Sequence, residues 1–219
     1  MLPKSVVTVY VDPVSPYVWL GVQAISAIEE AGATVELQPV LFAAMLDAHG
    51  TTGPAEVDVK RRYMFRDVMR QAALLGLPFR GPPGHPFNTL LALRMSLAIE
   101  ARDERRRFTL ALISAAWERG LDISDAAVLV NIANNCRLDG AALLAAAGEA
   151  PVKQRLRSDT EQAIADGVFG VPTFRLGDEL FWGGDRVATL LAYMQGSRID
   201  ATALAEFLSR PPLAQRTIR

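Results

Sequence analysis

The chain has 219 residues, of which 50% are hydrophobic and 21% charged, with 23 Lys and Arg against 24 Asp and Glu. These values are ordinary for a soluble globular protein of one large or two small domains, and the balanced charge argues against a nucleic-acid binder, which usually carries a basic excess. The single cysteine, Cys136, excludes an internal disulfide, a dithiol redox pair and a cysteine-based zinc cluster, and two histidines are too few for a histidine-rich metal site.

The first apolar run, Val6 to Val11, ends at Asp12 after six residues. A secretory core needs about 7–15 apolar residues and a membrane span about 20, so we expect neither and take the cytoplasm as the default location. The run is β-branched and aromatic and is apolar on both faces, which predicts a strand buried in the middle of a sheet.

A helix and a second strand are expected next. Ser15 followed by Pro16 is typical of a helix start, because a hydroxyl can cap free N–H groups and the proline ring already has the helical φ. We expect this helix to end at Gly32 and residues 34–40 to form a strand parallel to the first, since two parallel strands joined by a helix form a right-handed unit.

Only helices are expected between about Phe42 and Asp166. Apolar residues at helical spacing predict a helix over 57–75 that carries several arginines, and Asn88 can cap another helix after a proline-rich connection. Glycines that can end helices separate the remaining ones, which we expect over residues 105–118, 125–135, 139–147 and 153–166.

Strands return after Gly167. Residues 173–176 and 179–182 flank a Gly-Asp turn and predict a β-hairpin, followed by an amphipathic helix that reaches about Met194. The whole order predicts an α/β protein in which a small sheet domain is interrupted by an inserted all-helical domain. We place the sheet domain at residues 1–42 and 166–219 and the helical domain at residues 43–165.

Two segments could carry chemistry. Ser15 would stand at the carboxyl end of a central strand and the amino end of a helix, where free N–H groups and the helix dipole favour an anion. Its hydroxyl could donate a hydrogen bond to a bound thiolate and stabilise it, or it could simply cap the helix, which contributes about 1 kcal/mol.

In the second segment, the Val171–Pro172 bond could be cis, which would turn the Val171 N–H and C=O outward to pair with an extended, peptide-like ligand. Alternatively, a trans proline could start an edge strand. The local sequence does not choose between these two structures.

Taken together, Ser15-Pro16-Tyr17, Gly170-Val171-Pro172-Thr173, the hairpin and the final helix resemble the thioredoxin fold, with Ser15-Pro16-Tyr17 in the place of the usual redox cysteine pair. With its helical insertion, the chain resembles the family of kappa-class glutathione transferases and 2-hydroxychromene-2-carboxylate isomerases, within the DsbA-like thioredoxin superfamily. The resemblance covers about residues 5–196, and the stretch from Phe181 to Arg186 leans toward the isomerase branch.

This resemblance implies a thioredoxin-like sheet domain that binds glutathione. Ser15 would contact the glutathione sulfur, and the backbone of Val171, next to Pro172, would pair with the cysteinyl part of the tripeptide. Asp185 and Arg186 would hold the γ-glutamyl end, where an α-amino and an α-carboxyl group need opposite charges.

The resemblance also implies contacts outside the sulfur site. Lys60 matches the basic residue that holds a carboxylate, although the charged helix around it could be only a solvated face. Asn88 matches a polar residue that faces the cleft, and Tyr17 is a further candidate for contact with a second substrate. Trp182 could form a wall of the site or simply pack against the hairpin.

Three positions depart from the family pattern, namely Trp19, Gly184 and His85, and they predict a second-substrate pocket of different shape. We expect neither His49 nor His85 to act as a catalytic base, because no carboxylate and nucleophile are arranged around either. Cys136 lies beside apolar residues and is expected to be a buried structural thiol.

The function that the resemblance implies is a glutathione-dependent isomerisation of 2-hydroxychromene-2-carboxylate-type aromatic intermediates. The thiolate would add reversibly to a conjugated double bond, in a homodimeric enzyme that binds a small aromatic substrate. One alternative is a kappa-like glutathione transferase or peroxidase. Another is a non-catalytic thioredoxin-like module that binds extended peptides at Pro172.

Overall fold

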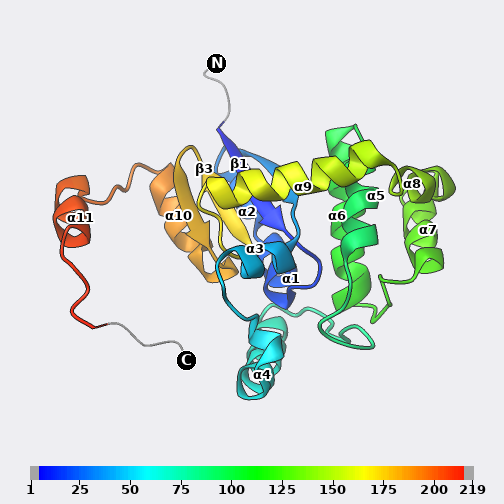
Figure 1. The fold of residues 1–219 in the computed structure, drawn as a ribbon, viewed down its shortest axis with the longest axis horizontal. Helices are drawn as coiled ribbons and strands as arrows, with labels where there is room; N and C mark the ends of the chain where they lie inside the picture. The colour runs from blue at the N-terminus through cyan, green and yellow to red at the C-terminus, as the bar shows by residue number, and fades with distance from the viewer. Residues whose placement is uncertain (1–4, 215–219) are drawn as a thin grey trace.

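The computed structural model describes residues 5–214, in which four strands form one mixed sheet (Figure 1). Their order is β2-β1-β3-β4, with β1 parallel to β2 and antiparallel to β3. β3 and β4 form the predicted hairpin. The bounds are Val6–Val11 for β1, Thr34–Pro39 for β2, Thr173–Leu176 for β3 and Glu179–Trp182 for β4.

The prediction of a buried central first strand is confirmed. Val7, Val9 and Val11 have no exposed surface, and Val9 pairs with Leu37 of β2 and Phe174 of β3. β1 lies between β2 and β3. The segment that follows its carboxyl end therefore begins at the centre of the sheet, between two neighbouring strands.

The helix expected before Gly32 is in fact two helices, α1 (Pro16–Val22) and α2 (Ile25–Glu30). In a continuous helix the Trp19 carbonyl would accept the backbone N–H of Gln23. Here it accepts the side-chain amide of Gln23 at 3.0 Å instead. The side chain thus replaces the backbone donor at the point where α1 ends.

The segment between β2 and β3 is helical, as predicted. Figure 1 shows α4 below the sheet, α5 to α8 on the right, and α9 running back from them along the sheet. The bounds are Phe42–Ala48 for α3, Asp58–Leu74 for α4, Leu90–Ala98 for α5, Arg102–Trp117 for α6, Ala126–Asn135 for α7, Gly140–Ala146 for α8 and Ala150–Ala165 for α9, with a short 3₁₀ helix, η1, at Pro54–Glu56.

After the hairpin come a 3₁₀ turn, η2 (Gly184–Arg186), the predicted helix α10 (Val187–Met194) and one helix more, α11 (Ala201–Leu208). Asp200 caps α11 by accepting from two backbone N–H groups of its first turn. Figure 1 shows α11 standing apart from the other elements. The sequence prediction ended with α10, although Asp200 before apolar residues at helical spacing, Leu204, Phe207 and Leu208, could have indicated this last helix.

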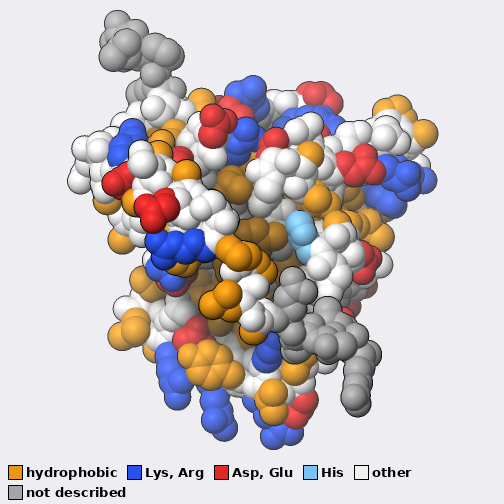
Figure 2. Space-filling model, turned by 60° about the vertical axis from the view of Figure 1, so that its left-hand side comes forward, with side chains coloured by type: hydrophobic (Ala, Val, Ile, Leu, Met, Phe, Trp, Pro, Cys, Tyr) orange, Lys and Arg blue, Asp and Glu red, His pale blue; other side chains and the backbone are white. Residues whose placement is uncertain are grey.

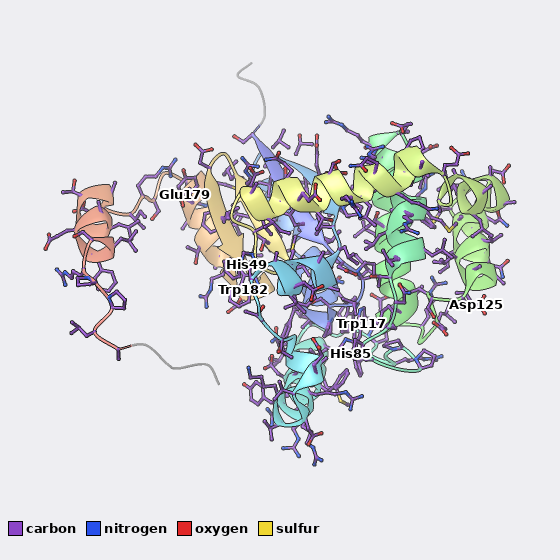
Figure 3. The ribbon with its side chains drawn as sticks, viewed as in Figure 1. His49, His85, Trp117, Asp125, Glu179 and Trp182 are labelled. Carbon is purple, nitrogen blue, oxygen red and sulfur yellow. The ribbon has the colours of Figure 1, made fainter. Side chains whose placement is uncertain are left out.

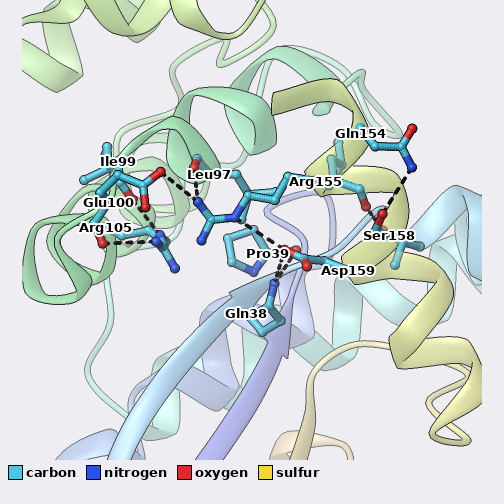
Figure 4. A network of polar contacts seen from close by, with 12 residues as sticks. Gln38, Pro39, Leu97, Ile99, Glu100, Arg105, Gln154, Arg155, Ser158 and Asp159 are labelled. Carbon is cyan, nitrogen blue, oxygen red and sulfur yellow. Dashed lines mark hydrogen bonds and ion pairs between the residues drawn. The ribbon is translucent and has the colours of Figure 1, made fainter. Parts of the chain in front are cut away.

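A polar network ties the helices to the sheet (Figure 4). Gln38 of β2 donates to Asp159 of α9 at 3.0 Å, and Arg155 of α9 donates to the Leu97 carbonyl of α5 at 2.9 Å. Arg105 of α6 donates to the Ile99 carbonyl, just after α5. The end of β2 and three of the helices are therefore fixed relative to one another.

The sheet and the helices also share one cluster of buried side chains. It includes Phe174 of the sheet, Trp19 of α1, and Phe108 and Trp117 of α6. The division into two domains at residues 42/43 and 165/166 stays a prediction. Within residues 5–214, no helix is both long and apolar enough to span a membrane.

Candidate functional site

A cleft of about 1610 Å³ opens where β1 ends and α1 begins, bordered also by α3, α4, the segment before α5, the loop before β3 and η2. Figure 2 shows this hollow, with hydrophobic side chains inside it and charged groups around it. The cleft brings together segments from both ends of the chain and from the helical insertion. Most of the predicted site residues line this cleft, namely Ser15, Tyr17, Asn88, Val171, Pro172, Trp182, Asp185 and Arg186.

Ser15 lies at the point where the loop from β1 meets α1, and only 8% of its surface is exposed. The prediction that its hydroxyl caps the helix is wrong, since within the described chain it makes no bond to the N–H groups of α1. The hydroxyl donates instead to the carbonyl of Val171 at 3.3 Å, because the tertiary fold brings the loop before β3 within reach. The two predicted segments therefore meet, although 156 positions separate these residues.

The Val171–Pro172 bond is cis, which decides between the two structures that the sequence left open. The Pro172 carbonyl accepts from the N–H of Gly183 at 2.9 Å, so the loop before β3 is joined to the start of η2. A second cis bond, His85–Pro86, was not anticipated.

Two glycines allow α1, Pro172 and η2 to approach closely. A Cβ on Gly21 would lie 2.9 Å from Cγ of Pro172, and a Cβ on Gly184 would lie 3.1 Å from Cα of Gly21. These separations are shorter than ordinary contacts between side chains. The departure noted at Gly184 therefore has a packing reason, because α1 occupies the space that a side chain would need.

Asp185 and Arg186 form an ion pair of 3.1 Å on η2, and more than half of each side chain is exposed. A carboxylate and a guanidinium side by side at the cleft present the two opposite charges that an amino-acid group requires.

Tyr17 belongs to a second polar group that faces the cleft. Its hydroxyl donates to Asp67 of α4 at 3.0 Å, and Gln71 donates to the same oxygen at 2.7 Å. Burial and, next, the bond to Asp67 raise the pKa of Tyr17, so that its phenol keeps its proton. Sequence reasoning missed Asp67 and Gln71, although their spacing of four residues places both on one face of a helix.

The other predicted contacts are more peripheral. Lys60 does not line the main cleft but a shallow depression of about 310 Å³ next to it, which shares Tyr17 with the cleft. Asn88 accepts from the backbone N–H of Leu90, the first residue of α5, at 2.9 Å, but the residue at the N-cap position of this helix is Thr89. Trp182 is 53% exposed and stands at the cleft, with its ring edge-to-face with Phe169 at 4.8 Å between centroids.

Asp12 is a buried carboxyl at the base of the cleft that sequence reasoning did not single out. Its two oxygens accept the N–H groups of Val14 at 3.1 Å and Phe42 at 3.0 Å. Burial raises the pKa of Asp12 to about 6, against the opposing effect of these bonds and of one from Thr89. Asp12 thus joins the loop before α1 to the start of α3.

His85 and Trp117 lie side by side near the lower end of α6 (Figure 3). His85 Nε2 is 2.9 Å from the carbonyl oxygen of Val14, and the indole N–H of Trp117 donates to the carbonyl of Pro13 at 2.9 Å. His85 therefore contacts the loop that carries Ser15. Trp19 is fully buried and donates to Glu118, so this departure from the family pattern belongs to the core.

The predicted buried thiol is confirmed, since Cys136 is 8% exposed and burial raises its pKa. Within residues 5–214, no three His, Cys, Asp or Glu side chains gather in a group that could hold a metal ion. A parallel β-α-β unit, a hairpin and a cis-proline loop facing the first helix define a thioredoxin fold whose site presents Ser15 instead of a cysteine.

Comparisons with known proteins also lead to the thioredoxin fold. A family model described as a DsbA-like thioredoxin domain matches residues 6–195. The chain is 28% identical over 197 residues to 2-hydroxychromene-2-carboxylate isomerase of Pseudomonas putida, with 86% of this chain and 94% of that protein covered. It is 25% identical over 209 residues to glutathione S-transferase kappa 2 of Caenorhabditis elegans, with 87% and 92% covered.

A solved structure of a 2-hydroxychromene-2-carboxylate isomerase superposes with a TM-score of 0.81 at 25% identity, and the match covers 94% of this chain and 100% of that one. The chain belongs to the DsbA-like thioredoxin domain family. The resemblance to 2-hydroxychromene-2-carboxylate isomerases and kappa-class glutathione transferases is confirmed as well.

Proposed function

We propose that this protein is a glutathione-dependent isomerase that acts on aromatic substrates of the 2-hydroxychromene-2-carboxylate type. The observation that carries the proposal is the contact between the Ser15 hydroxyl and the Val171 carbonyl, inside a cleft that also presents Asp185 and Arg186. The names of the relatives support enzyme activity within a glutathione-related isomerase and transferase family.

The residues present fit the tripeptide chemically. The backbone beside Pro172 would pair with the cysteinyl part, which places the sulfur next to Ser15. Asp185 and Arg186 would bind the α-amino and α-carboxyl groups of the γ-glutamyl end through charge-assisted hydrogen bonds. Both charged side chains are exposed enough to exchange their mutual contact for contacts with a ligand.

The role of Ser15 would be to donate a hydrogen bond to the ionised sulfur. Its present bond to Val171, at 3.3 Å, is long for a hydroxyl donor, so the proton can turn toward a charged acceptor. A free thiol with a pKa near 8.5 is only slightly ionised at neutral pH, and lowering it by about two units requires about 2.7 kcal/mol.

Glutathione would supply a thiolate that adds to a conjugated carbon, so that rotation about the resulting single bond and elimination yield the other isomer. The chain would hold the second substrate beside the sulfur. Trp182 and Phe169 offer aromatic surface at the cleft, and Lys60 stands beside the adjoining depression as a cation for a carboxylate.

The test is to compare Ser15→Ala with the native protein. Loss of the hydroxyl should reduce turnover by about a hundredfold, equivalent to about 2.7 kcal/mol, with only a modest change in glutathione affinity. Ser26→Ala, an exposed position on α2, is the matched control and should behave as the native protein does. Unchanged turnover in Ser15→Ala would remove Ser15 from the mechanism.

A second reading, conjugation by a transferase or reduction of a peroxide, uses the same site. Isomerisation returns glutathione unchanged, whereas conjugation or oxidation consumes it. Measurement of the free thiol concentration during turnover therefore separates these reactions. We expect this concentration to stay constant. Peptide binding with no measurable affinity for glutathione would instead favour the non-catalytic module.

We further propose that the enzyme is a homodimer, as the family resemblance implies, and that it works in the cytoplasm, the default location expected from the sequence. The exposed apolar side chains of α11, which are Leu204, Phe207 and Leu208, are consistent with a covered surface in such an assembly. The mass in solution should be twice that of the single chain. Sedimentation that gives the single-chain mass would contradict this part of the proposal.

A further inference from the structure

The two peptide groups before Ser15 are each held at both ends. In the Pro13–Val14 peptide, the carbonyl accepts from Trp117 at 2.9 Å and the N–H donates to the Asp12 side chain at 3.1 Å. In the Val14–Ser15 peptide, the carbonyl lies 2.9 Å from His85 Nε2 and the N–H donates to the Asp12 carbonyl at 3.0 Å. A planar peptide fixed at its carbonyl and at its N–H has little freedom to rotate.

The donors to both carbonyls come from the helical insertion. His85 is 71 positions from Val14, and Trp117 is 104 positions from Pro13. The orientation of the loop that carries Ser15 is therefore set by residues outside the sheet. Asp12 supplies the acceptors for both N–H groups from within the loop itself.

The contact with Val14 defines the hydrogen position on His85. A carbonyl oxygen can only accept, so Nε2 carries the proton in this contact. Nδ1 is buried and has no hydrogen-bond partner within residues 5–214, so the ring is held in one tautomer. The rings of Phe65, Phe87 and Trp117 surround it, with centroids between 5.3 and 6.2 Å away.

We propose that His85 is a positioning residue for the reaction at Ser15, acting through the Val14–Ser15 peptide. This inference rests on the proposed glutathione chemistry and adds a specific residue to it. Without the Nε2–H donor the Val14 carbonyl loses its partner, and rotation of this peptide changes the direction in which the Ser15 side chain points. A displacement of about 1 Å at a reacting group can cost a factor of about a hundred in rate.

Two substitutions separate the hydrogen bond from the packing. His85→Phe keeps an aromatic ring among Phe65, Phe87 and Trp117 but has no donor. His85→Gln lacks the ring but can place an amide N–H where Nε2 stands. We expect kcat to fall about tenfold in His85→Phe, with a much smaller change in KM for glutathione, and to recover largely in His85→Gln.

Hydrogen exchange at the backbone amides of Val14 and Ser15 gives a readout that needs no glutathione. Exchange at both amides should be faster in His85→Phe than in the native protein and close to native in His85→Gln. Thermal unfolding of each variant identifies any general loss of stability. If the native protein proves inactive with glutathione, the proposed function fails, while the exchange data still test the role of His85.

The inference is overturned if His85→Phe keeps native kcat and native exchange at both amides. It is also overturned if the two variants lose activity equally in proportion to their loss of stability, since His85 would then serve only to pack the aromatic group.

Discussion

Asp12 serves the fold and the site at the same time. Its two carboxylate oxygens join Val14, in the loop before Ser15, to Phe42, at the start of α3. The carboxyl is almost completely buried, at 1% exposure, and the loss of water around it disfavours its ionised form. The same residue that orders the loop therefore makes stability depend on pH.

The pKa of Asp12 is about 6 in the folded protein and 3.8 in its ordinary state, so the folded form retains the proton to higher pH. Its contribution to stability is greatest below about pH 4, falls as the pH rises toward 6, and is constant above. At 1.36 kcal/mol per unit, the difference between 3.8 and about 6 corresponds to a change of about 3 kcal/mol.

The measurement is the free energy of unfolding in urea for the native protein and for Asp12→Asn between pH 4 and pH 7. Over this range the native protein should lose about 2.4 kcal/mol relative to the variant as the pH rises. Asp178→Asn, in the exposed hairpin turn, is the control and should follow the native curve. If the difference in free energy of unfolding between the native protein and Asp12→Asn does not change with pH, Asp12 does not titrate in this range.

Single residues differ in how far the sequence predicts their role. Ser15 and Pro172 could be predicted because each stands in a short motif with a local chemical meaning. Asp12, His85 and Trp117 could not, because their roles depend on contacts with backbone groups that only the folded chain brings near. Only the structure shows that the ring at position 85 places a nitrogen 2.9 Å from the Val14 carbonyl oxygen.

Among the elements, α1, η2 and the loop at Pro172 approach one another closely at the proposed sulfur site. Gly21 and Gly184 make this approach possible. The contact joins the helix that follows Ser15 to the turn that carries Asp185 and Arg186. The same packing therefore fixes both the proposed sulfur end and the proposed γ-glutamyl end of the glutathione site.

Gly21→Ala should therefore damage both stability and binding. Its Cβ would lie 2.9 Å from Pro172 Cγ, and overpacking of this kind costs about 1–3 kcal/mol. Displacement of Pro172 should also weaken glutathione binding. Denaturation in urea and calorimetry with glutathione measure the two effects.

Gly84→Ala is the matched control for stability, because a Cβ there meets no atom within 4 Å among the described residues. It should leave the free energy of unfolding unchanged within about 1 kcal/mol. If Gly21→Ala is as stable as the native protein and binds glutathione equally well, the close contact with Pro172 does not support the site.

The sequence predicted the kind and order of most elements, and the errors have local causes. A β-branched run, an alternating segment and two short runs around a Gly-Asp turn identified the four strands, and apolar residues at helical spacing identified the long helices. The break between α1 and α2 was missed because it depends on one side chain, Gln23, that replaces a backbone donor. α11 was missed although Asp200 caps it and its apolar residues have helical spacing, because the sequence reasoning did not extend beyond α10.

For the whole molecule, the helical insertion is part of the site. It supplies one wall of the cleft through α3 and α4, and it supplies the donors that hold the loop before Ser15. The shared core and the network around Arg155 fix the insertion to the sheet. The sequence could predict that an insertion exists, but its placement over the carboxyl end of β1 follows from long-range packing.

We propose that this cleft holds glutathione with its sulfur ionised next to Ser15. The most direct measurement is the ultraviolet thiolate absorbance of glutathione bound to the protein, followed as a function of pH. The chain's own thiol, Cys136, adds little signal near neutral pH because burial raises its pKa.

Glutathione bound to the native protein should titrate about two units below the free thiol, whose pKa is about 8.5, and the pKa should return toward the free value in Ser15→Ala. If bound glutathione titrates like the free thiol, or if the protein retains none of it at millimolar concentration, then the cleft does not hold an ionised sulfur next to Ser15.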